Sequence, residues 1–406
     1  ACSAAIRAVL VQGWRVLQAI SAGTQDFIFD SFLRLSHKRW SLFFSMNMLG
    51  RLLSHDLPRN RLLTLILLII VIGLALAPFV FPGVKALNVA AKVLIFVVLV
   101  AAFDLLLGYT GIVSFAHTMF FGIGAYGVAI ASTRLGEGFA AVGIGLAAAL
   151  AVSLALSLVI GLFSLRVKAI FYAMVTLAVA AAFQTLASQL SELTGGEDGL
   201  TFRNPEWLSP SFETTWFGWA VDGKLIGYYV LFACTALLFL ALLRIVNSPF
   251  GRVLQAIREN DFRAEAIGYR TVVYRTLSNV IGALFATVAG ALLALTLRYT
   301  GPDTTLSFEI MLDILLVVVI GGMGTLYGAV IGSVLFVLAQ NYLQDLLKLA
   351  AGALEGVPVA SALFTPDRWL LWLGVLFVLS VYHFPTGIVG RLRARSIPAP
   401  TRRTTP

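Results

Sequence analysis

Long apolar runs alternate with short polar connections from Leu62 onward. About 20 apolar residues are enough for an α-helix to cross the hydrocarbon core of a bilayer. We predict ten such helices, at approximately residues 62–81, 86–107, 112–131, 140–165, 169–190, 226–246, 276–297, 308–323, 326–347 and 369–386. The predicted fold is therefore an all-α, polytopic bundle of membrane helices.

One polar stretch, residues 247–275, interrupts this pattern with dense charge. Ser248 suits the N-cap of a helix, and Pro249 suits its first residue. The apolar residues that follow recur at helical spacing, which predicts a stripe along one face of a charged helix. These residues are Phe250, Val253, Leu254 and Ile257. A second short helix is expected at residues 262–267, with Gly268 as its stop.

The composition agrees with a membrane protein. Hydrophobic residues make up 59% of the chain and charged residues 12%, whereas a soluble domain has about 25% charged residues. We read the net charge of +9 through the tendency of Lys and Arg to gather in cytoplasmic loops, and not as affinity for nucleic acid. Cys2 and Cys234 imply neither a disulfide framework nor a thiolate metal site.

The basic connections predict the orientation of the chain. With ten spans, every large cluster of Lys and Arg falls on the same side as both termini. These clusters are at residues 59–61, 166–168, 247–275 and 391–403, whereas the acidic connection at residues 192–222 falls on the other side. We therefore predict a multi-pass membrane protein whose N- and C-termini are cytoplasmic.

Three regions follow from this reading. Residues 1–57 contain no apolar run long enough to span, so they form an amphipathic surface helix or a disordered extension, and we favour an extension without a transport role. Residues 58–392 form the transmembrane domain, and residues 393–406 form a basic cytoplasmic tail.

Repeated short patterns suggest how the helices are arranged. Five spans in each half would make the halves inverted in topology, and Tyr-Thr-Gly triplets at residues 109–111 and 299–301 occupy matching places. Small residues at a spacing of about four predict close helix contacts. They are Gly282, Ala286 and Gly290, and also Gly324, Gly328 and Gly332, and we expect Gly122, Gly124 and Gly127 to play the same part in the third span.

Five polar residues within or beside the spans are candidates for a translocation path, namely Asp104, Tyr109, Ser114, His117 and Asp313. The Gly-rich segment 108–117 predicts either a broken helix along the path or a tight cytoplasmic turn. A carboxylate inside a span is costly and is a functional candidate by default, although we favour structural hydrogen bonding for Asp104 and Asp313. His117 has no second metal ligand at suitable spacing, so a hydrogen bond to a nearby carbonyl is expected.

No catalytic motif is present. The chain lacks the GxxxxGK[ST] phosphate loop, HExxH and GxSxG. We therefore predict no catalytic residues, no metal site and no cofactor in this chain, so that ATP and Mg²⁺, if used, would bind to partner subunits.

Several ordered segments resemble the branched-chain amino-acid permease family of ABC importers. GRVLQAIRENDFRAEAIG (251–268) is similar to that family's ATPase-coupling loop, and FPTGIVG (384–390) to its usual end. The other similar segments are GYTGIVSFAHTMFFGIGAYG (108–127), FYAMVTLAVA (171–180), LTGGEDGL (193–200) and GGMGTLYGAVIGS (321–333). The resemblance covers approximately residues 62–390, and Phe115 and Ala116 depart from residues that are common in the family.

The resemblance implies a membrane subunit that works with a second homologous permease, two ATP-binding subunits and a periplasmic solute-binding protein. It assigns ATPase coupling to Phe250, Gly251, Arg252, Val253, Leu254, Ile257, Arg258, Glu259, Asn260, Glu265, Ala266 and Gly268. We expect the apolar stripe of the first short helix to be exposed and to dock into a groove of the ATPase.

Other functions remain open at this point. A related permease for urea or short amides shares the Gly-Tyr-Thr-Gly pattern at residues 108–111. A stand-alone proton-coupled carrier would use Asp104 and Asp313. A membrane-embedded enzyme would need clustered polar groups within the spans, and the sequence shows none.

Overall fold

The computed structural model describes residues 61–80, 83–164, 169–208, 212–216, 219–353 and 364–394. The chain divides into two units, Ala1–His55 and Asp56–Pro406, and all described residues belong to the second. The predictions for residues 1–57, for the basic residues at 59 and 166–168, and for the tail beyond residue 394 lie outside this part of the chain.

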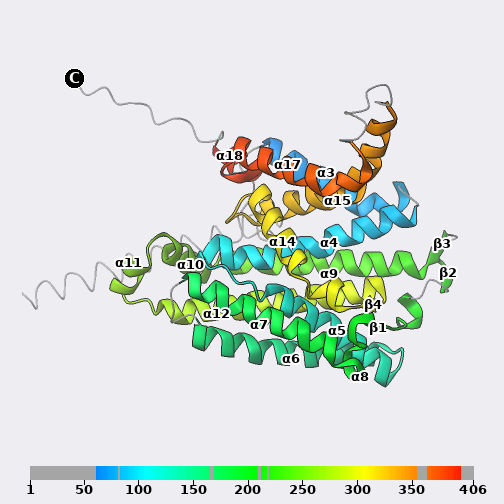
Figure 1. Cartoon of the computed structure of the whole chain (residues 1–406), viewed down its shortest axis with the longest axis horizontal. Helices are drawn as coiled ribbons and strands as arrows, with labels where there is room; N and C mark the ends of the chain where they lie inside the picture. Colours follow the sequence, from blue (N-terminus) through cyan, green and yellow to red (C-terminus); the bar gives the residue numbers. More distant parts are fainter. Residues whose placement is uncertain are drawn as a thin grey trace, which may run out of the picture. The chain divides into compact units, whose positions relative to one another are not determined.

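Helices dominate the described residues, which confirms the predicted fold class (Figure 1). The long helices are α3 (Arg61–Val80), α4 (Val84–Asp104), α5 (His117–Leu135), α6 (Phe139–Ser164), α7 (Ala169–Gln189), α9 (Gly223–Val246), α12 (Thr271–Leu297), α14 (Phe308–Gly321), α15 (Leu326–Ala353) and α17 (Trp369–His383). Shorter helices are α8 (Ser191–Thr194), α10 (Pro249–Glu259), α11 (Asp261–Ala266), α13 (Pro302–Thr305) and α18 (Gly387–Ala394).

The remaining elements are short. A π-helical turn, η1 (Leu105–Thr110), follows α4, and 3₁₀ turns occur at η2 (Gly196–Asp198), η3 (Glu206–Leu208) and η4 (Pro366–Arg368). Two antiparallel strand pairs join β1 (Leu200–Thr201) to β4 (Tyr299–Thr300) and β2 (Glu213–Trp216) to β3 (Trp219–Asp222).

Each of the ten predicted spans coincides with one of the long helices, but one prediction needs correction. Among the described residues, nine helical stretches are long and apolar enough to cross a membrane, and α5 is not one of them. His117 and Arg134, together with its glycines, threonines and serine, dilute its apolar character. Helix α5 also begins at His117, later than predicted, because residues 111–116 are irregular.

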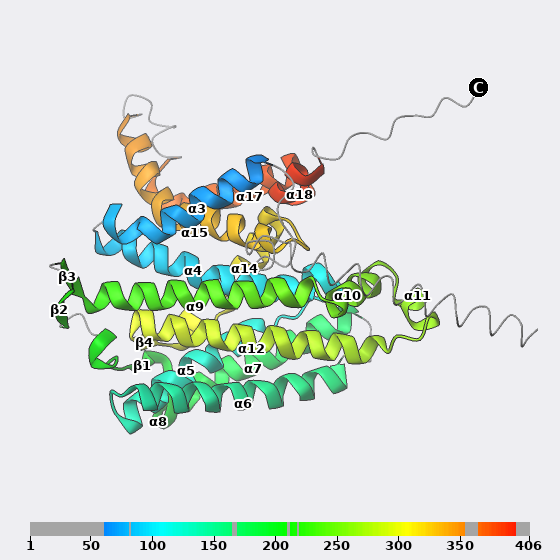
Figure 2. The same cartoon turned by 180° about the vertical axis from the view of Figure 1, so that it is seen from behind.

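The long helices run lengthwise, with α10 and α11 at one end and β2 and β3 at the other, as both views show (Figures 1 and 2). Helix α12 packs against α4, α5 and α6, and α4 packs against α9 and α15. Helix α4 is almost wholly buried along its span, whereas α3 and α17 are mostly exposed. The large apolar side chains that α3 and α17 leave exposed suit contact with lipid tails.

Glycines allow α5 and α12 to approach closely, as the small-residue spacing predicts. A Cβ atom added to Gly124 would lie 1.8 Å from the carbonyl oxygen of Thr287, and one added to Gly290 would lie 1.8 Å from that of Phe121. No larger side chain fits either contact without separating the two helix backbones.

Buried hydrogen bonds join α12 to α6 and α7. The Thr287 hydroxyl donates to Ser153 Oγ over 2.7 Å, which links α12 to α6. Asn279 of α12 accepts from the Tyr172 hydroxyl over 3.1 Å and donates to the Ser157 carbonyl over 3.1 Å. Polar groups that bond to one another inside a membrane bundle avoid the cost of facing hydrocarbon.

The two Tyr-Thr-Gly triplets lie at opposite ends of the bundle, as inverted halves would require. Residues 109–111 follow α4 at the α10–α11 end, and Tyr299–Thr300 form β4 after α12 at the other end. Their conformations differ, because the first triplet ends a π-helical turn and the second forms a strand.

We predict that Gly290→Leu will destabilise the bundle, because the new side chain cannot fit against the Phe121 carbonyl. Overpacking of this kind costs about 1–3 kcal/mol or more, so the melting temperature of the detergent-solubilised protein should fall. Gly143→Leu is the matched control, since nothing lies within 4 Å of a Cβ atom added at Gly143 of α6. Equal melting temperatures for the two variants would contradict the close packing of α5 and α12.

Candidate functional site

The polar stretch 247–275 folds as two short helices, as predicted. The Ser248 side chain accepts a hydrogen bond from the Gly251 backbone N–H, and Pro249 opens α10. Asn260 ends α10 and caps α11, where its side chain accepts from the Arg263 N–H over 2.9 Å. Gly268 follows α11 with φ +96°, a conformation that favours glycine.

The prediction that the apolar stripe of α10 is exposed is wrong. Leu254 is 0% exposed and Ile257 is 1% exposed, while Phe250 stacks on Tyr274 with ring centroids 5.8 Å apart. Helix α10 packs against α9, α12 and η1, so its stripe covers the ends of the chain's own helices. A stripe at helical spacing predicts a buried face but cannot specify whether the chain itself or a partner covers it.

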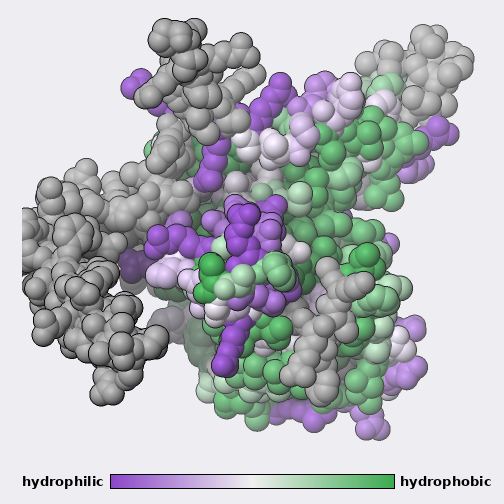
Figure 3. Space-filling model, turned by 90° about the vertical axis from the view of Figure 1, so that its left-hand side faces the viewer, coloured by the Kyte–Doolittle hydropathy of each residue, from purple (hydrophilic) through white to green (hydrophobic). Residues whose placement is uncertain are grey.

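The surface of this end is instead polar, with two prominent apolar side chains on or beside α11. Phe262 is 82% exposed and Ile267 is 67% exposed. The charged side chains of Arg252, Glu259, Arg263 and Glu265 are exposed around them. Figure 3, which views the molecule from this end, shows hydrophilic residues gathered near the centre of the face.

Arg258 connects α10 to the interior of the bundle. Its guanidinium donates a hydrogen bond to the carbonyl oxygen of Gly108, in the π-helical turn after α4. A Cβ atom added to Gly111 would lie 3.1 Å from the Arg258 side chain, and one added to Gly324 would lie 2.8 Å from its nitrogen. The arginine therefore occupies a space that glycines leave open on both sides.

Asp104, at the end of α4 and one turn before Gly108, also contacts this group of residues. Its Oδ1 accepts a hydrogen bond from the Gly324 backbone N–H over 2.9 Å, and the positive charge of Arg258 is close enough to stabilise its carboxylate. Asp104 is 1% exposed. We call Asp104, Gly108, Arg258 and Gly324 the arginine junction, because they tie α10 to the end of α4 and to the connection between α14 and α15.

Residues 108–117 form neither a simple broken helix along a path nor a tight surface turn, the two forms that the sequence predicts. The segment is a break between α4 and α5 at the α10–α11 end, but its side chains are mostly buried, unlike those of a surface turn. Ser114 and His117 are each 1% exposed. The Phe115 N–H donates to the Thr176 hydroxyl over 3.1 Å, which fixes the break against α7.

The other candidates for the translocation path near this end, His117 and Tyr109, are packed among side chains of the bundle. His117 packs against Phe103, with ring centroids 5.4 Å apart, and its buried Nε2 has no hydrogen-bond partner among the described residues. Tyr109 is buried beside the junction. The structure thus groups Asp104, Tyr109, Ser114 and His117 at one end of the bundle.

Asp313 lies elsewhere, in the half of α14 nearer the β2–β3 end. Its Oδ2 accepts from the Gln340 side-chain amide over 3.4 Å, and the Gln340 carbonyl oxygen accepts from Lys92 Nζ over 2.8 Å. Lys92 and Gln340 were not among the candidates predicted from the sequence. The signal was available for Lys92, because a cation inside the predicted span 86–107 is as unusual as the carboxylate at position 313.

These three residues line a cavity of about 680 Å³ between α4, α12, α14 and α15. Its deeper wall is apolar and includes Ile95, Phe96, Phe121 and Leu293. Its outer wall includes the exposed residues Asn88, Asp303, Thr304 and Glu309.

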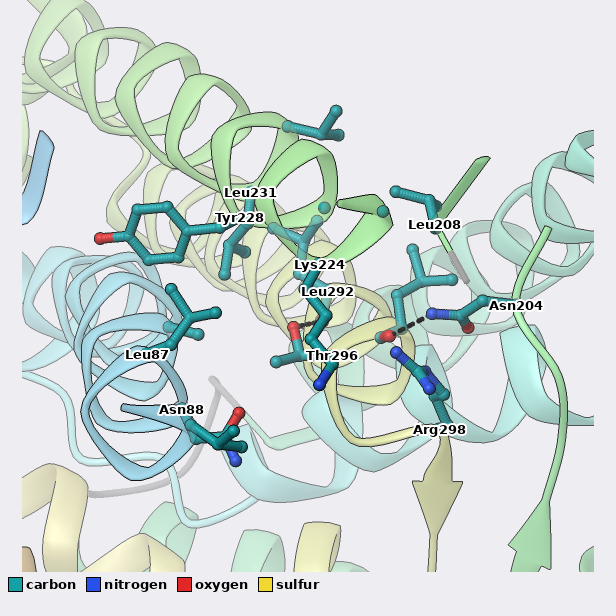
Figure 4. Close-up of a pocket in the computed structure, with 16 residues that line it drawn as sticks. Leu87, Asn88, Asn204, Leu208, Lys224, Tyr228, Leu231, Leu292, Thr296 and Arg298 are labelled. Carbon is teal, nitrogen blue, oxygen red and sulfur yellow. Dashed lines mark hydrogen bonds between the residues drawn. The ribbon is translucent and has the colours of Figure 1, made fainter. Parts of the chain in front are cut away.

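A second cavity of about 130 Å³ lies beside it and shares Val84, Asn88 and Thr296 with it. The buried Asn204 donates to the Leu295 carbonyl over 2.6 Å at its edge (Figure 4). Lys224 and Arg298 also line this space, so it is basic. Within the described ranges, no group of three His, Cys, Asp or Glu side chains could hold a metal ion in either cavity.

The comparison with protein families identifies the chain. The model of the "Branched-chain amino acid transport system / permease component" family matches residues 85–381, most of the chain. The chain belongs to this family. It is a multi-pass membrane permease, and the resemblance read from the sequence motifs is confirmed.

Relatives from two bacteria cover most of the permease. The high-affinity branched-chain amino acid transport system permease protein LivM of Salmonella typhimurium is 25% identical over 304 residues, which are 70% of each chain. LivM of Escherichia coli is 24% identical over 302 residues, covering 70% of this chain and 69% of that protein.

A third relative is archaeal. The probable branched-chain amino acid transport permease protein LivM of Methanocaldococcus jannaschii is 30% identical over 169 residues, covering 41% of this chain and 47% of that protein. No solved structure matches the permease.

Proposed function

We propose that this permease carries branched-chain or related amino acids across the bacterial inner membrane as one subunit of an ATP-driven importer. Its partners are a second homologous permease, two ATP-binding subunits and a periplasmic solute-binding protein. The family match over residues 85–381 is the observation that carries the proposal. ATP and Mg²⁺ bind to the partner ATPases, and this chain performs no hydrolysis.

The orientation follows from charge. The α10–α11 end carries Arg252, Arg258, Arg263 and Arg270, and basic loops are favoured on the cytoplasmic side. In this orientation the α10–α11 end faces the ATPases, and the β2–β3 end faces the periplasm and the solute-binding protein.

The ATPase docks on the outer surface of the α10–α11 pair, and not on the buried stripe of α10. Phe262 and Ile267 offer apolar anchors that water surrounds in this chain alone, and an apolar anchor in a partner's pocket supplies much of the affinity of an interface. The surrounding Arg and Glu side chains then set the register of docking.

The arginine junction transmits the movement of α10 to the transmembrane helices. When the ATPases close, they displace α10 and α11, and Arg258 pulls on the Gly108 carbonyl at the end of α4. Asp104 and Gly324 extend this connection to α14 and α15. Rigid movement of these helices opens the solute path alternately to the two sides.

A stand-alone proton-coupled carrier is less well supported. Asp104 is engaged by the Gly324 N–H at one end of α4, and Asp313 is hydrogen-bonded to Gln340 in a different part of the bundle. The two carboxylates therefore do not form a continuous relay among the described residues.

We expect uptake of radiolabelled leucine by proteoliposomes that contain the complete complex to require internal ATP, because the chain's own fold offers no other energy source. The binding protein is added to the outside, and the vesicles carry no proton gradient. A protonophore should leave the uptake unchanged. Uptake that persists without ATP and collapses with a proton gradient would contradict the proposal, and ATP-driven uptake of urea in place of leucine would replace its substrate.

Phe262→Glu should release the ATPases from the permease while membrane insertion stays normal, because a charge cannot enter an apolar pocket of the partner. A truncated interface anchor typically costs about 2 kcal/mol or more, equivalent to at least a tenfold loss of affinity. Co-purification of the ATPases on tagged permease measures the effect, and Phe262→Tyr is the control that keeps the ring.

Ile257→Glu provides the contrast for this experiment. It buries a charge beneath α10 and should lower the yield of folded permease itself. Full ATPase recovery with Phe262→Glu would contradict docking on α11.

A further inference from the structure

The cavity of about 680 Å³ beside Lys92 combines opposite charges with an apolar floor. We propose that it binds one α-amino acid, with the solute carboxylate at Lys92, the ammonium group at Asp313, and the aliphatic side chain on the apolar floor. This inference rests on the proposed function and specifies where in the permease the solute binds and which groups recognise it.

The charges stand in an order that suits a zwitterion. The Gln340 amide separates Lys92 from Asp313, since its carbonyl oxygen accepts from Lys92 and its NH₂ group donates to Asp313. The cavity wall is therefore positive at one point and negative at a nearby point. An α-amino acid carries one negative and one positive group on adjacent carbon positions, so both can be satisfied at once.

The position of these charges argues for a function. Lys92 and Asp313 lie within membrane-spanning helices, where each charged group costs several kcal/mol unless it faces a partner or a water-filled cavity. Both line the same cavity. Lys92 also lies over the Phe96 ring, with Nζ 5.6 Å from the ring centroid, which holds the amine at the border between the polar and apolar walls.

The cavity lining offers apolar surface to an aliphatic side chain. Val84 is 60% exposed and Leu297 is 47% exposed, whereas Ile95, Phe96, Phe121 and Leu293, which also line the cavity, are buried. Apolar lining with a few placed polar groups is the usual composition of a site for a small molecule, and such sites commonly occupy about 300–1,000 Å³. A branched aliphatic chain gains from this wall, whereas a second charge or an amide would lose its hydration there.

Access lies on the side that the proposed orientation assigns to the periplasm. The cavity is lined at its outer part by exposed Asn88 and Glu309, near the starts of α4 and α14. The starts of both helices are at the end opposite α10 and α11. The arginine junction stands at the other end of α4, so this conformation offers the cavity to the side from which a binding protein delivers solute.

A purely structural explanation predicts different behaviour. The Lys92–Gln340–Asp313 chain could serve only to join α4 to α14 and α15. In that case its variants lose stability, and binding in the cavity does not depend on the charges of the solute. The two explanations therefore differ in which solutes the cavity recognises, and not only in whether the variants are active.

The test places a cysteine at Asn88 in the complete complex, after Cys2 and Cys234 are changed to Ser. A membrane-impermeant thiol reagent labels Asn88→Cys in nanodiscs without ATP, and L-leucine is added as the probe. At a concentration ten times its dissociation constant, leucine should slow labelling about tenfold. The analogues 4-methylpentanoate, without the ammonium, and 3-methylbutylamine, without the carboxylate, should protect far less at the same concentration.

Two nearly isosteric variants then test the assigned groups. Lys92→Met and Asp313→Asn should each raise the leucine concentration for half-protection at least about tenfold, because each removes a charge-assisted hydrogen bond. Lys348→Met, an exposed change on α15, should leave that concentration unchanged. Two separate variants are used so that a folding failure in one does not decide the result.

Equal protection by leucine and both analogues, or full protection in folded Lys92→Met and Asp313→Asn, would overturn the site. Absence of leucine protection in a complex that takes up leucine with ATP would also overturn it while leaving the proposed function intact. Protection without any ATP-driven uptake would contradict the proposed function and support the site.

Discussion

The hydrogen bond from Arg258 to the Gly108 carbonyl joins the polar surface of α10 and α11 to the membrane-spanning core of the permease. Arg258 belongs to α10, and Gly108 follows the most buried long helix, α4. The interaction is possible because Gly108, Gly111 and Gly324 present no side chains where the guanidinium and the Asp104 carboxylate must fit.

The same junction explains how a buried carboxylate is tolerated. Asp104 is buried, and its Oδ2 makes no hydrogen bond among the described residues. The Gly324 N–H and the charge of Arg258 offset only part of the cost of removing it from water. The carboxylate, in turn, ties the α14–α15 connection to the end of α4. A charge that would destabilise an isolated helix therefore fixes the meeting point of three helix ends.

The sequence predicted what depends on local pattern. Apolar length located all ten long helices, and Ser248 and Pro249 located the start of α10 because capping depends on adjacent residues. What depends on tertiary contact could not be predicted. The stripe through Leu254 and Ile257 looks the same whether a partner or the chain itself covers it, and the π-helical turn before Gly111 has no sequence signature that distinguishes it from a helix end.

The candidate site was predicted only in part for a similar reason. Single residues such as Asp313 are conspicuous inside an apolar run, but their partners come from other helices. Gln340 lies 27 positions further along the chain, and its role is visible only once α14 and α15 pack together. The two ends of α4 thus have different functions in this account. Lys92 faces the solute, and Asp104 belongs to the junction that α10 moves.

The ratio of ATP hydrolysed to leucine transported by Arg258→Ala tests this coupling most directly. Both rates would be measured in the same proteoliposomes, with Arg252→Ala as the control, since Arg252 is exposed on the same helix, as Arg258 is, but its side chain makes no hydrogen bond to α4 or η1 among the described residues. The account predicts that the ATPases still bind and hydrolyse ATP while uptake per ATP falls about tenfold, because a charge-assisted hydrogen bond of roughly 1.5–3 kcal/mol no longer links α10 to α4. An unchanged ratio in Arg258→Ala would contradict the account.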